Sequence, residues 1–449
     1  MFAKTSSQDS YAARRERVVR QMQTASGHVT LRKASSNLFR DRNRADKALL
    51  DVHDFNHILQ VDPAAGWVDA EGMVSYEKLV LATLTCGVMP SVVPQLKTIT
   101  LGGAVAGVGI EASSFRYGLV HHGILEMDIL AGDGNVYLCT PHNEHSQLFF
   151  GFPNSYGTLG YALRVRAKTI PVKKFVRLEH SRYGDAGAYF RGLLALCNSA
   201  VDFVDGVVFG PNEMYLSAAT FVDEAPFVSD YTFEHIFYRS IREKPTDHLS
   251  VHDFLWRWDT DWFWCSKNFG AQNRFIRQIA GRKRLNSLTY TKIMRWNSRW
   301  KLTHRLDAMS GVHRESVIQD VDIPITRAEE FFRFFTQDIG ILPIWICPIR
   351  SPDKRAFTLY PLDASTLYVN FGFWDVVKSN KTQLPGHFNR LIERKVAELG
   401  GIKSLYSDSY YSRPEFDAIY GAQAYRALKS RYDPQHRLHD LYDKCVLRA

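Results

Sequence analysis

A glycine-rich segment near residue 100 restricts the fold of this chain more than any other feature. Gly102, Gly103, Gly107 and Gly109 fall within eight positions, and small residues fill most of the gaps. Backbone with so few side chains can pass close to a bulky ligand and offer amide N–H groups to phosphate oxygens. Because glycines also serve turns and tight packing, the segment alone is weak evidence for a ligand loop.

The elements after this segment follow a definite order, which is stronger evidence. Residues 125–139 alternate apolar and polar side chains around a turn at 132–134, which predicts a β-hairpin. A second glycine pair, Gly157 and Gly160, precedes a strand-like run over 161–170.

This order resembles the flavin domain of the vanillyl-alcohol-oxidase type. The closer likeness is to the delta-24-sterol reductases and to related bacterial flavoproteins that process methyl-branched fatty acyl chains. The residues that carry it are Gly102-Gly103, 107–114, Tyr117-Gly118, 130–134, 139–141, 157–160, 343–348 and 406–410. The resemblance implies an α+β fold: an FAD-binding domain of two subdomains, an α+β substrate (cap) domain, and a C-terminal tail that returns to the FAD domain.

The length of 449 residues also favours two domains over one core. We expect the FAD-binding domain over 1–175, the cap over 176–404, and the returning tail over 405–449. Periodicity predicts helices over 10–23, 75–86, 325–338 and 386–399, a strand hairpin over 203–221, and strands over 341–348 and 358–373.

The resemblance implies noncovalent FAD. Glu111 or a neighbour stands where the wider fold places its linking histidine, and His121 and His122 are expected to be structural. Ser36 and Asn37 would supply donors to the pyrophosphate, although a helix cap is the other interpretation of these two residues. The full set of expected cofactor residues is Ser36, Asn37, Gly102, Gly103, Gly107, Gly109, Ile110, Glu111, Ser113, Ser114, Tyr117, Gly118, Gly157 and Gly160.

By the same resemblance, the segment 405–411 reaches the flavin ring. Adding or removing hydrogen at carbon needs an acid or base nearby, and Asp408, Tyr410 and Tyr406 are the expected catalytic residues. The alternative is that these tyrosines only pack on the ring. The expected substrate-contacting residues are Gln319, Asp320, Trp345 and Arg350.

The predicted function is an FAD-dependent oxidoreductase that reduces a carbon–carbon double bond or methylene group in a membrane-lipid acyl chain, with NADPH as donor. The residues leave three alternatives open: a dehydrogenase that introduces a double bond into a methylated acyl phospholipid, a sterol side-chain reductase, and a non-catalytic membrane-binding flavoprotein. They do not define the oligomeric state.

Charge and composition bear on location and partners. The formal net charge is +9, and residues 262–306 hold eleven Lys/Arg, no Asp/Glu and many aromatics. This block fits an anionic membrane surface, with a lipid methyltransferase as a further candidate partner, or a plain solvated basic face; nucleic acid is not expected. No apolar run has the length of a membrane span, and the start resembles no signal peptide, so we expect a cytoplasmic protein at the inner face of the membrane.

The cysteines and a tryptophan-rich segment are two further features of the sequence. The six cysteines lie far apart, which predicts reduced thiols and no metal site. Four tryptophans within 256–264 form either the mouth of an acyl tunnel or a buried aromatic cluster.

Overall fold

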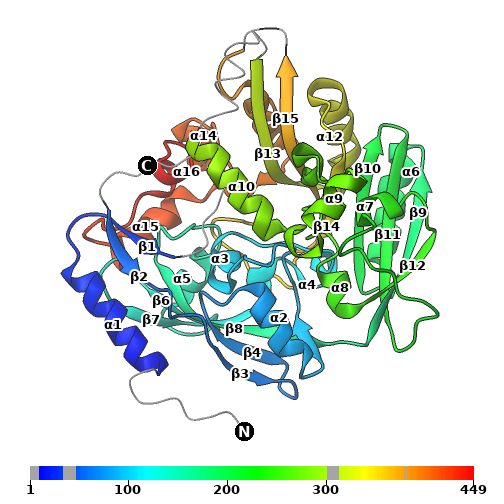
Figure 1. Cartoon of the computed structure of the whole chain (residues 1–449). Coiled ribbons are helices and arrows are strands. Elements are labelled where there is room, and N and C mark those ends of the chain that lie inside the picture. Colours follow the sequence, from blue (N-terminus) through cyan, green and yellow to red (C-terminus); the bar gives the residue numbers. More distant parts are fainter. Residues whose placement is uncertain (1–9, 34–46, 301–312, 380, 382) are drawn as a thin grey trace.

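The computed structural model describes residues 10–33, 47–300, 313–379, 381 and 383–449. Two antiparallel sheets organise this part of the chain (Figure 1). The first has the order β3-β4-β8-β6-β7, with β5 paired to β8. Its strands are β3 (Ile58–Asp62), β4 (Trp67–Glu71), β5 (Val88–Pro90), β6 (Ile124–Leu130), β7 (Val136–Cys139) and β8 (Tyr161–Pro171).

The second sheet has eight strands in the order β12-β9-β11-β10-β14-β15-β13-β16. Its strands are β9 (Phe175–Tyr183), β10 (Phe203–Gly210), β11 (Glu213–Val222), β12 (Thr246–Ser250), β13 (His313–Pro324), β14 (Ile344–Ile349), β15 (Tyr368–Ser379) and β16 (Ile402–Lys403). Together with the helices, the two sheets give the α+β fold expected from the sequence.

Helices cover one face of the second sheet. Three of them, α6 (Ala186–Cys197), α12 (Ala328–Phe334) and α13 (His387–Glu398), pack there around a separate apolar core. Successive side chains of a strand point to opposite faces, so on β13 Val317 and Val321 enter this core while Asp320 and Asp322 face the other way. This alternation along β13 decides which of its side chains can reach a site between the two sheets.

The glycine-rich segment is partly helical, which differs from the loop expected. Residues Leu101–Ala106 form the short helix α3, whose N-cap Thr100 accepts a hydrogen bond from the amide of Gly103 through its side chain. The loop begins only at Gly107. A threonine cap ahead of small residues permits this turn of helix, and the close packing of Gly102 on Gly72 fixes it against the first sheet.

The C-terminal helices lie against the first sheet and its loops (Figure 1). They are α14 (Arg413–Ile419), α15 (Ala422–Tyr432) and α16 (Leu441–Cys445). The ammonium of Lys429 donates to the Thr158 carbonyl over 2.8 Å, and that of Lys444 donates to the Tyr156 carbonyl over 2.7 Å. The tail thereby holds the 154–160 loop, which borders the site described below.

Most predicted elements are present, with shifted ends. The hairpins 124–139 and 203–222 are confirmed, as are the helices α1 (Tyr11–Thr24), α2 (Tyr76–Leu84) and α13. The strand predicted from 358 starts only at Tyr368, because Pro361 and a polar turn at Asp363 interrupt the run. The remaining helices are α4 (Ser114–Tyr117), α5 (Ser146–Gly151), α7 (Phe237–Ser240), α8 (Val251–Leu255), α9 (Arg274–Ala280) and α10 (Ser287–Trp300); β1 (Val29–Arg32) and β2 (Ala48–Asp51) pair in parallel.

Candidate functional site

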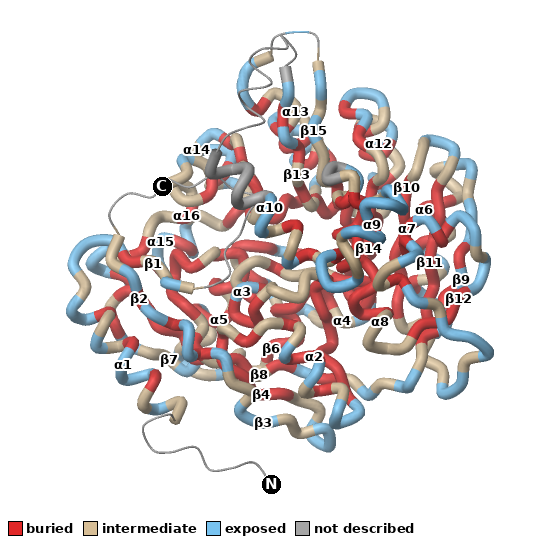
Figure 2. The backbone as a smooth tube through the Cα atoms, in the orientation of Figure 1, coloured by how far each residue is buried: buried red, intermediate tan, exposed pale blue. Residues whose placement is uncertain are grey.

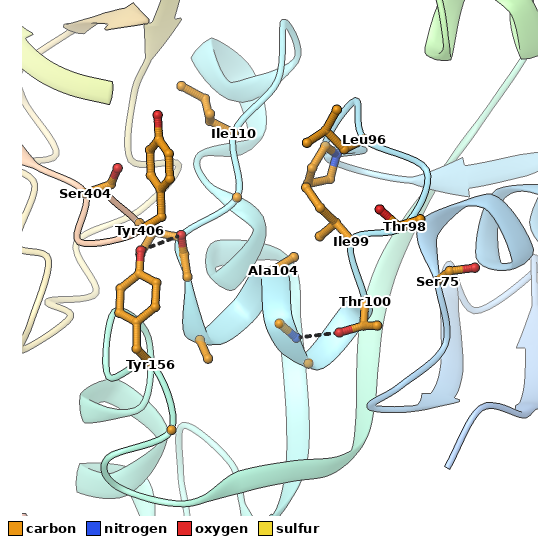
Figure 3. A pocket seen from close by; sticks show the side chains of 18 of the residues that line it. Ser75, Leu96, Thr98, Ile99, Thr100, Ala104, Ile110, Tyr156, Ser404 and Tyr406 are labelled. Atoms are coloured by element: carbon orange, nitrogen blue, oxygen red, sulfur yellow. Dashed lines mark hydrogen bonds between the residues drawn. The ribbon is translucent and has the colours of Figure 1, made fainter. Parts of the chain in front are cut away.

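A cavity of about 950 Å³ lies between the two sheets, lined by residues of both. Its size is near the upper end of the ~300–1,000 Å³ typical of ligand pockets. Figure 3 shows Tyr156, Ser404 and Tyr406 on one side and Leu96 and Ile99 on the other, with the α3 segment passing between them. The cavity therefore joins the glycine-rich segment to the inner face of the cap sheet.

Most of the predicted cofactor residues line this cavity. They are Gly102, Gly103, Gly107, Gly109, Ile110, Glu111, Gly157 and Gly160. Within the described part of the chain, the amides of Gly107, Val108 and Ile110 donate to no protein acceptor. Three free N–H groups on small residues beside a large cavity are what a phosphate-bearing cofactor needs.

Close packing also requires some of these glycines. A Cβ on Gly160 would lie 2.6 Å from the Leu130 carbonyl oxygen, and one on Gly102 would lie 3.0 Å from that of Gly72. Both are backbone atoms, which cannot move aside as a side chain can. Ligand access and strand packing therefore act together at these positions.

Four of the expected cofactor residues do not line the cavity. Ser113 Oγ donates to the Ser91 carbonyl over 2.7 Å, and Ser114 Oγ accepts from the Glu111 amide over 3.1 Å. Tyr117 and Gly118 end the short helix α4 behind them. These residues shape the turn that brings Glu111 to the cavity. Ser36 and Asn37 lie outside the described residues.

Backbone strain gathers at the cavity. Seven described residues other than glycine have positive φ, and four of them line it: Val108 (51°), Tyr156 (50°), Trp262 (43°) and Phe263 (60°). Positive φ is unfavourable for bulky residues and most of all for β-branched valine. Such strain is retained where the surroundings enforce it, commonly at functional sites.

Asp320 and Tyr406 form a polar pair in the cavity wall. The Tyr406 hydroxyl hydrogen-bonds to the Asp320 carboxyl and accepts from Trp374 Nε1 over 2.9 Å. The pKa of Asp320 is raised to about 7, mainly by burial and to a smaller extent by the Asp322 charge, although the Tyr406 hydrogen bond opposes the rise. Burial, followed by the Asp320 charge, raises the pKa of Tyr406 well above its usual range. A carboxyl poised near neutrality suits acid–base work.

A second carboxylate lies two residues further along β13. Asp322 accepts from the Tyr360 hydroxyl over 2.7 Å and from the Asn370 amide over 2.8 Å. Burial raises its pKa to about 6, although both hydrogen bonds oppose the rise. Asp322 is more fully hydrogen-bonded than Asp320, whose Oδ1 is buried without a partner. This favours Asp320 as the group that exchanges a proton.

Glu111 is held by a buried ion-pair network. The guanidinium of Arg257 contacts one oxygen each of Glu111 and Asp205 at 2.8 Å, and all three side chains are buried. Burial raises the pKa of Glu111, against the opposing charge of Arg257. Its other oxygen, Oε2, is buried and has no protein partner. Glu111 lines the cavity, so its carboxyl borders a ligand bound there.

Aromatic side chains form the cap side of the cavity. Phe263 packs on Trp374 with ring centroids 4.4 Å apart and edge-on to Trp345 at 5.4 Å, and Trp262 is adjacent. Of the four tryptophans considered for a tunnel mouth, only Trp262 reaches the cavity; Trp256, Trp258 and Trp264 are buried beside it. The buried-cluster interpretation is therefore confirmed for Trp256, Trp258 and Trp264, whereas the tunnel mouth stays a prediction for Trp262.

Four expected residues lie away from the cavity. Gln319 points to the helix side of β13, where it donates to Asn389 over 2.6 Å, and Arg350 donates to Asn198 over 3.1 Å at the surface. Asp408 and Tyr410 meet Arg448 instead.

The segment after Tyr406 turns back because of a buried ion pair. Glu393 contacts Lys403 at 2.7 Å and accepts from the Tyr410 amide over 3.1 Å, while Lys403 also donates to the Asp408 carbonyl over 2.6 Å. The structure therefore brings together Tyr406, Asp320 and Trp345 of the predicted chemical residues, and it leaves Asp408, Tyr410, Gln319 and Arg350 outside.

The two neighbouring histidines lie outside the cavity wall. His121 and His122 are buried against Phe357 and do not line the cavity; burial lowers the pKa of His122 to about 4. Over the described ranges, no group of three or more His, Cys, Asp or Glu side chains could hold a metal ion, and no helix is long and apolar enough to cross a membrane.

The fold and the cavity define an FAD-binding protein of the vanillyl-alcohol-oxidase type. A model of the FAD binding domain matches residues 12–140. The chain is also similar to the Delta(24)-sterol reductase of Homo sapiens, 26% identical over 413 residues that cover 87% of this chain and 76% of that protein. The Delta(24)-sterol reductase of Arabidopsis thaliana is 23% identical over 444 residues, covering 87% and 75%. Cytokinin dehydrogenase 7 of Oryza sativa is 30% identical over 150 residues, covering 32% of this chain and 28% of that protein.

The chain is accordingly an FAD-dependent oxidoreductase related to the sterol reductases. The site fits the cofactor on grounds of its own: a cavity of sufficient size, three free amides on the glycine segment, and an unpartnered carboxylate oxygen on Glu111.

Proposed function

We propose that this enzyme reduces a carbon–carbon double bond or methylene group in the acyl chain of a membrane lipid. The observation that carries the proposal is the composition of the cavity: aromatic walls at Trp262, Phe263 and Trp345 surround one acid–base pair, Asp320 and Tyr406. An alkyl chain gains most from apolar walls. A buried carboxyl near neutral pKa supplies what such a chain lacks, a proton donor.

FAD, when bound, supplies the hydride that one carbon of the double bond receives. The other carbon needs a proton, and the Tyr406 hydroxyl is placed in the wall to give it, with Asp320 replacing that proton. Trp374 fixes the hydroxyl through its Nε1–H. The free amides of Gly107, Val108 and Ile110 would hold the pyrophosphate, and Glu111, oriented by Arg257, would border the isoalloxazine ring.

We further propose that FAD is held without a covalent bond and that NADPH is the electron donor. Support for the first point is the position of His121 and His122, which pack on Phe357 away from the cavity. NADPH is the class of donor that a flavin reductase of this kind would need, since no residue of the site can itself deliver hydride.

The reverse reaction is the nearest alternative. A dehydrogenase that introduces a double bond into a methylated acyl phospholipid would use the same pair, with Asp320 ionised as the base. A sterol side chain is the alternative that the names of the relatives favour. In a non-catalytic flavoprotein, the raised pKa of Asp320 would serve no reaction, which argues against this alternative.

Product analysis in D₂O tests the proposal. The purified holoenzyme is incubated with NADPH and with phospholipid that carries methylene-substituted or unsaturated chains, and the acyl chains are released for mass spectrometry. We expect saturated product with at least one non-exchangeable deuteron, the one delivered from Tyr406; a second can come from exchange at the N–H of the reduced flavin. Desaturated product from a methylated saturated chain would favour the dehydrogenase. Turnover of a sterol side chain alone would replace the lipid assignment.

A further inference from the structure

The surface of helix α9 and the first turns of α10 has an unusual composition. Phe275, Ile276 and Ile279 of α9 are 75%, 43% and 81% exposed, and Leu288 and Ile293 of α10 are about 40% exposed (38% and 40%). Figure 2 shows α9 as an exposed helix on the outside of the cap. Adjacent exposed apolar side chains on a short surface element mark an interaction site more often than single ones do.

Cations outnumber acids around these apolar side chains, where Arg282 pairs with Asp230 at 2.8 Å. Arg274, Lys283, Arg284 and Lys292 are exposed and make no ion pair with a described residue. No Asp or Glu occurs between 262 and 306. The charge of this patch, defined as residues 274–293, is therefore complementary to an anionic surface.

Buried anchors fix the orientation of the patch. Asp261 contacts Arg277 at 2.6 Å, Asp259 accepts from Ser287, and the Tyr290 hydroxyl donates to the Thr260 carbonyl over 2.9 Å. These bonds attach one side of α9 and α10 to the buried tryptophan segment. Three aromatic residues of the block 262–306, namely Trp262, Trp264 and Tyr290, are buried, so aliphatic side chains and Phe275 face outward instead.

The patch is continuous with the cavity. Leu288, Thr291 and Lys292 of α10 line it, and Leu288 and Lys292 are also exposed. One helix therefore contributes both to the outer patch and to the cavity wall.

We propose that the patch 274–293 docks the enzyme on an anionic phospholipid bilayer and that acyl chains enter the cavity past Leu288. The apolar side chains would enter the acyl boundary of the leaflet, and the cations would face the lipid phosphates. The proposal rests on the acyl substrate of the proposed function, but binding is measured without turnover, so the two can fail separately.

The test is flotation of the full-length holoenzyme with vesicles of phosphatidylcholine alone or with phosphatidylglycerol. We expect binding to the anionic vesicles only, weakened by 0.5 M NaCl. Each cation near an anionic surface contributes roughly fivefold in affinity, so Lys283→Glu with Arg284→Glu should weaken binding by about 25-fold or more. Phe275→Ser with Ile279→Ser should also abolish flotation.

Two matched controls keep the result specific. Leu384→Ser with Phe227→Ser removes exposed apolar side chains elsewhere, and Arg182→Glu with Lys354→Glu makes the same charge change at other exposed sites. Both controls should float like the original protein, and all variants should keep the flavin absorbance. The proposal would be overturned if the patch variants floated as well as the original protein, or if the original protein did not float at all. It would also be overturned if the patch substitutions abolished self-association or RNA binding and left vesicle binding unchanged. Turnover of detergent-dispersed lipid checks the activity independently.

Discussion

Trp374 Nε1 donates to the hydroxyl of Tyr406 over 2.9 Å, and the same hydroxyl hydrogen-bonds to the Asp320 carboxyl. Trp374 and Asp320 come from adjacent strands of the cap sheet, whereas Tyr406 follows the last strand. The arrangement joins residues from separate segments into one hydrogen-bonded group in the cavity wall.

Removal of this pair should stop chemistry without loss of the cofactor. We expect Asp320→Asn and Tyr406→Phe to lower turnover by ~10²–10⁴-fold, the usual contribution of a positioned acid, with the flavin spectrum retained. Tyr410→Phe is the matched control, because its hydroxyl meets Arg448 outside the cavity. Steady-state rates and flavin absorbance measure both effects. Equal losses in Tyr406→Phe and Tyr410→Phe would contradict the role of Tyr406.

The pH dependence of the rate should report the pKa of Asp320. Reduction needs the protonated carboxyl, so its rate should fall as pH rises through about 7. Dehydrogenation needs the carboxylate, so its rate should rise over the same range. The profile of the acyl-chain half-reaction, measured by stopped flow, thus distinguishes the directions. A flat profile from pH 5 to 9 would exclude Asp320 from the rate-limiting step.

Stability should respond to the same group. Folding raises the pKa of Asp320 from 3.8 to about 7. The contribution of Asp320 to the free energy of unfolding is therefore fully present below pH 3.8 and is lost as pH rises through about 7. Asp320→Asn removes this loss and should stabilise the fold above pH 7, by up to about 4 kcal/mol at 1.36 kcal/mol per unit of pKa. Thermal unfolding at pH 5 and pH 8 checks the difference, which should be larger at pH 8.

The glycine segment gives a cofactor prediction. A Cβ on Gly107 would lie 2.9 Å from the Gly103 carbonyl oxygen and 3.4 Å from the Tyr156 ring, so Gly107→Ala must displace the loop. We expect FAD affinity to fall at least about tenfold, the effect of a 1.4 kcal/mol loss. In Gly210→Ala, where no atom lies within 4 Å, affinity should be unchanged. Flavin fluorescence titration of the apoprotein measures both.

The network at Glu111 gives a stability prediction. Arg257→Met leaves the buried carboxylates of Glu111 and Asp205 without their cation, a change that typically costs ~3–5 kcal/mol. Arg242→Met breaks the half-exposed pair with Glu213 and the contact of Arg242 with the Phe209 ring, and it should cost about 1 kcal/mol. Urea unfolding compares the two variants. A similar small cost for both would mean that the buried network does not hold Glu111.

Local signals in the sequence were sufficient for much of the fold. The hairpin around Gly132, the alternation along β8 and the apolar spacing of α1 and α13 all act within a few residues, and each element formed as predicted. Thr100 was the missed local signal: a cap ahead of small residues starts a helix, not a loop.

The site was predictable only in part, because two of its determinants are not local. Gln319 and Asp320 were both expected at the substrate, yet a strand can present only one of two neighbours to the cavity, and sheet pairing decides which. Tyr406 and Tyr410 looked equivalent, but the Lys403–Glu393 pair turns the chain away after Tyr406. Asp322 and Tyr360 were missed, although an acidic residue two positions from Asp320 signals the same face.

The central claim, an FAD-containing reductase, is tested most directly by the anaerobic visible spectrum of the purified protein during titration with NADPH. We predict an oxidised-flavin band that bleaches with NADPH and returns when unsaturated or methylene-bearing phospholipid is added. If the flavin band is unchanged by NADPH and bleaches only with methylated saturated lipid, the enzyme is a dehydrogenase and the reaction runs in the opposite direction. A colourless protein that takes up no added FAD would contradict the account.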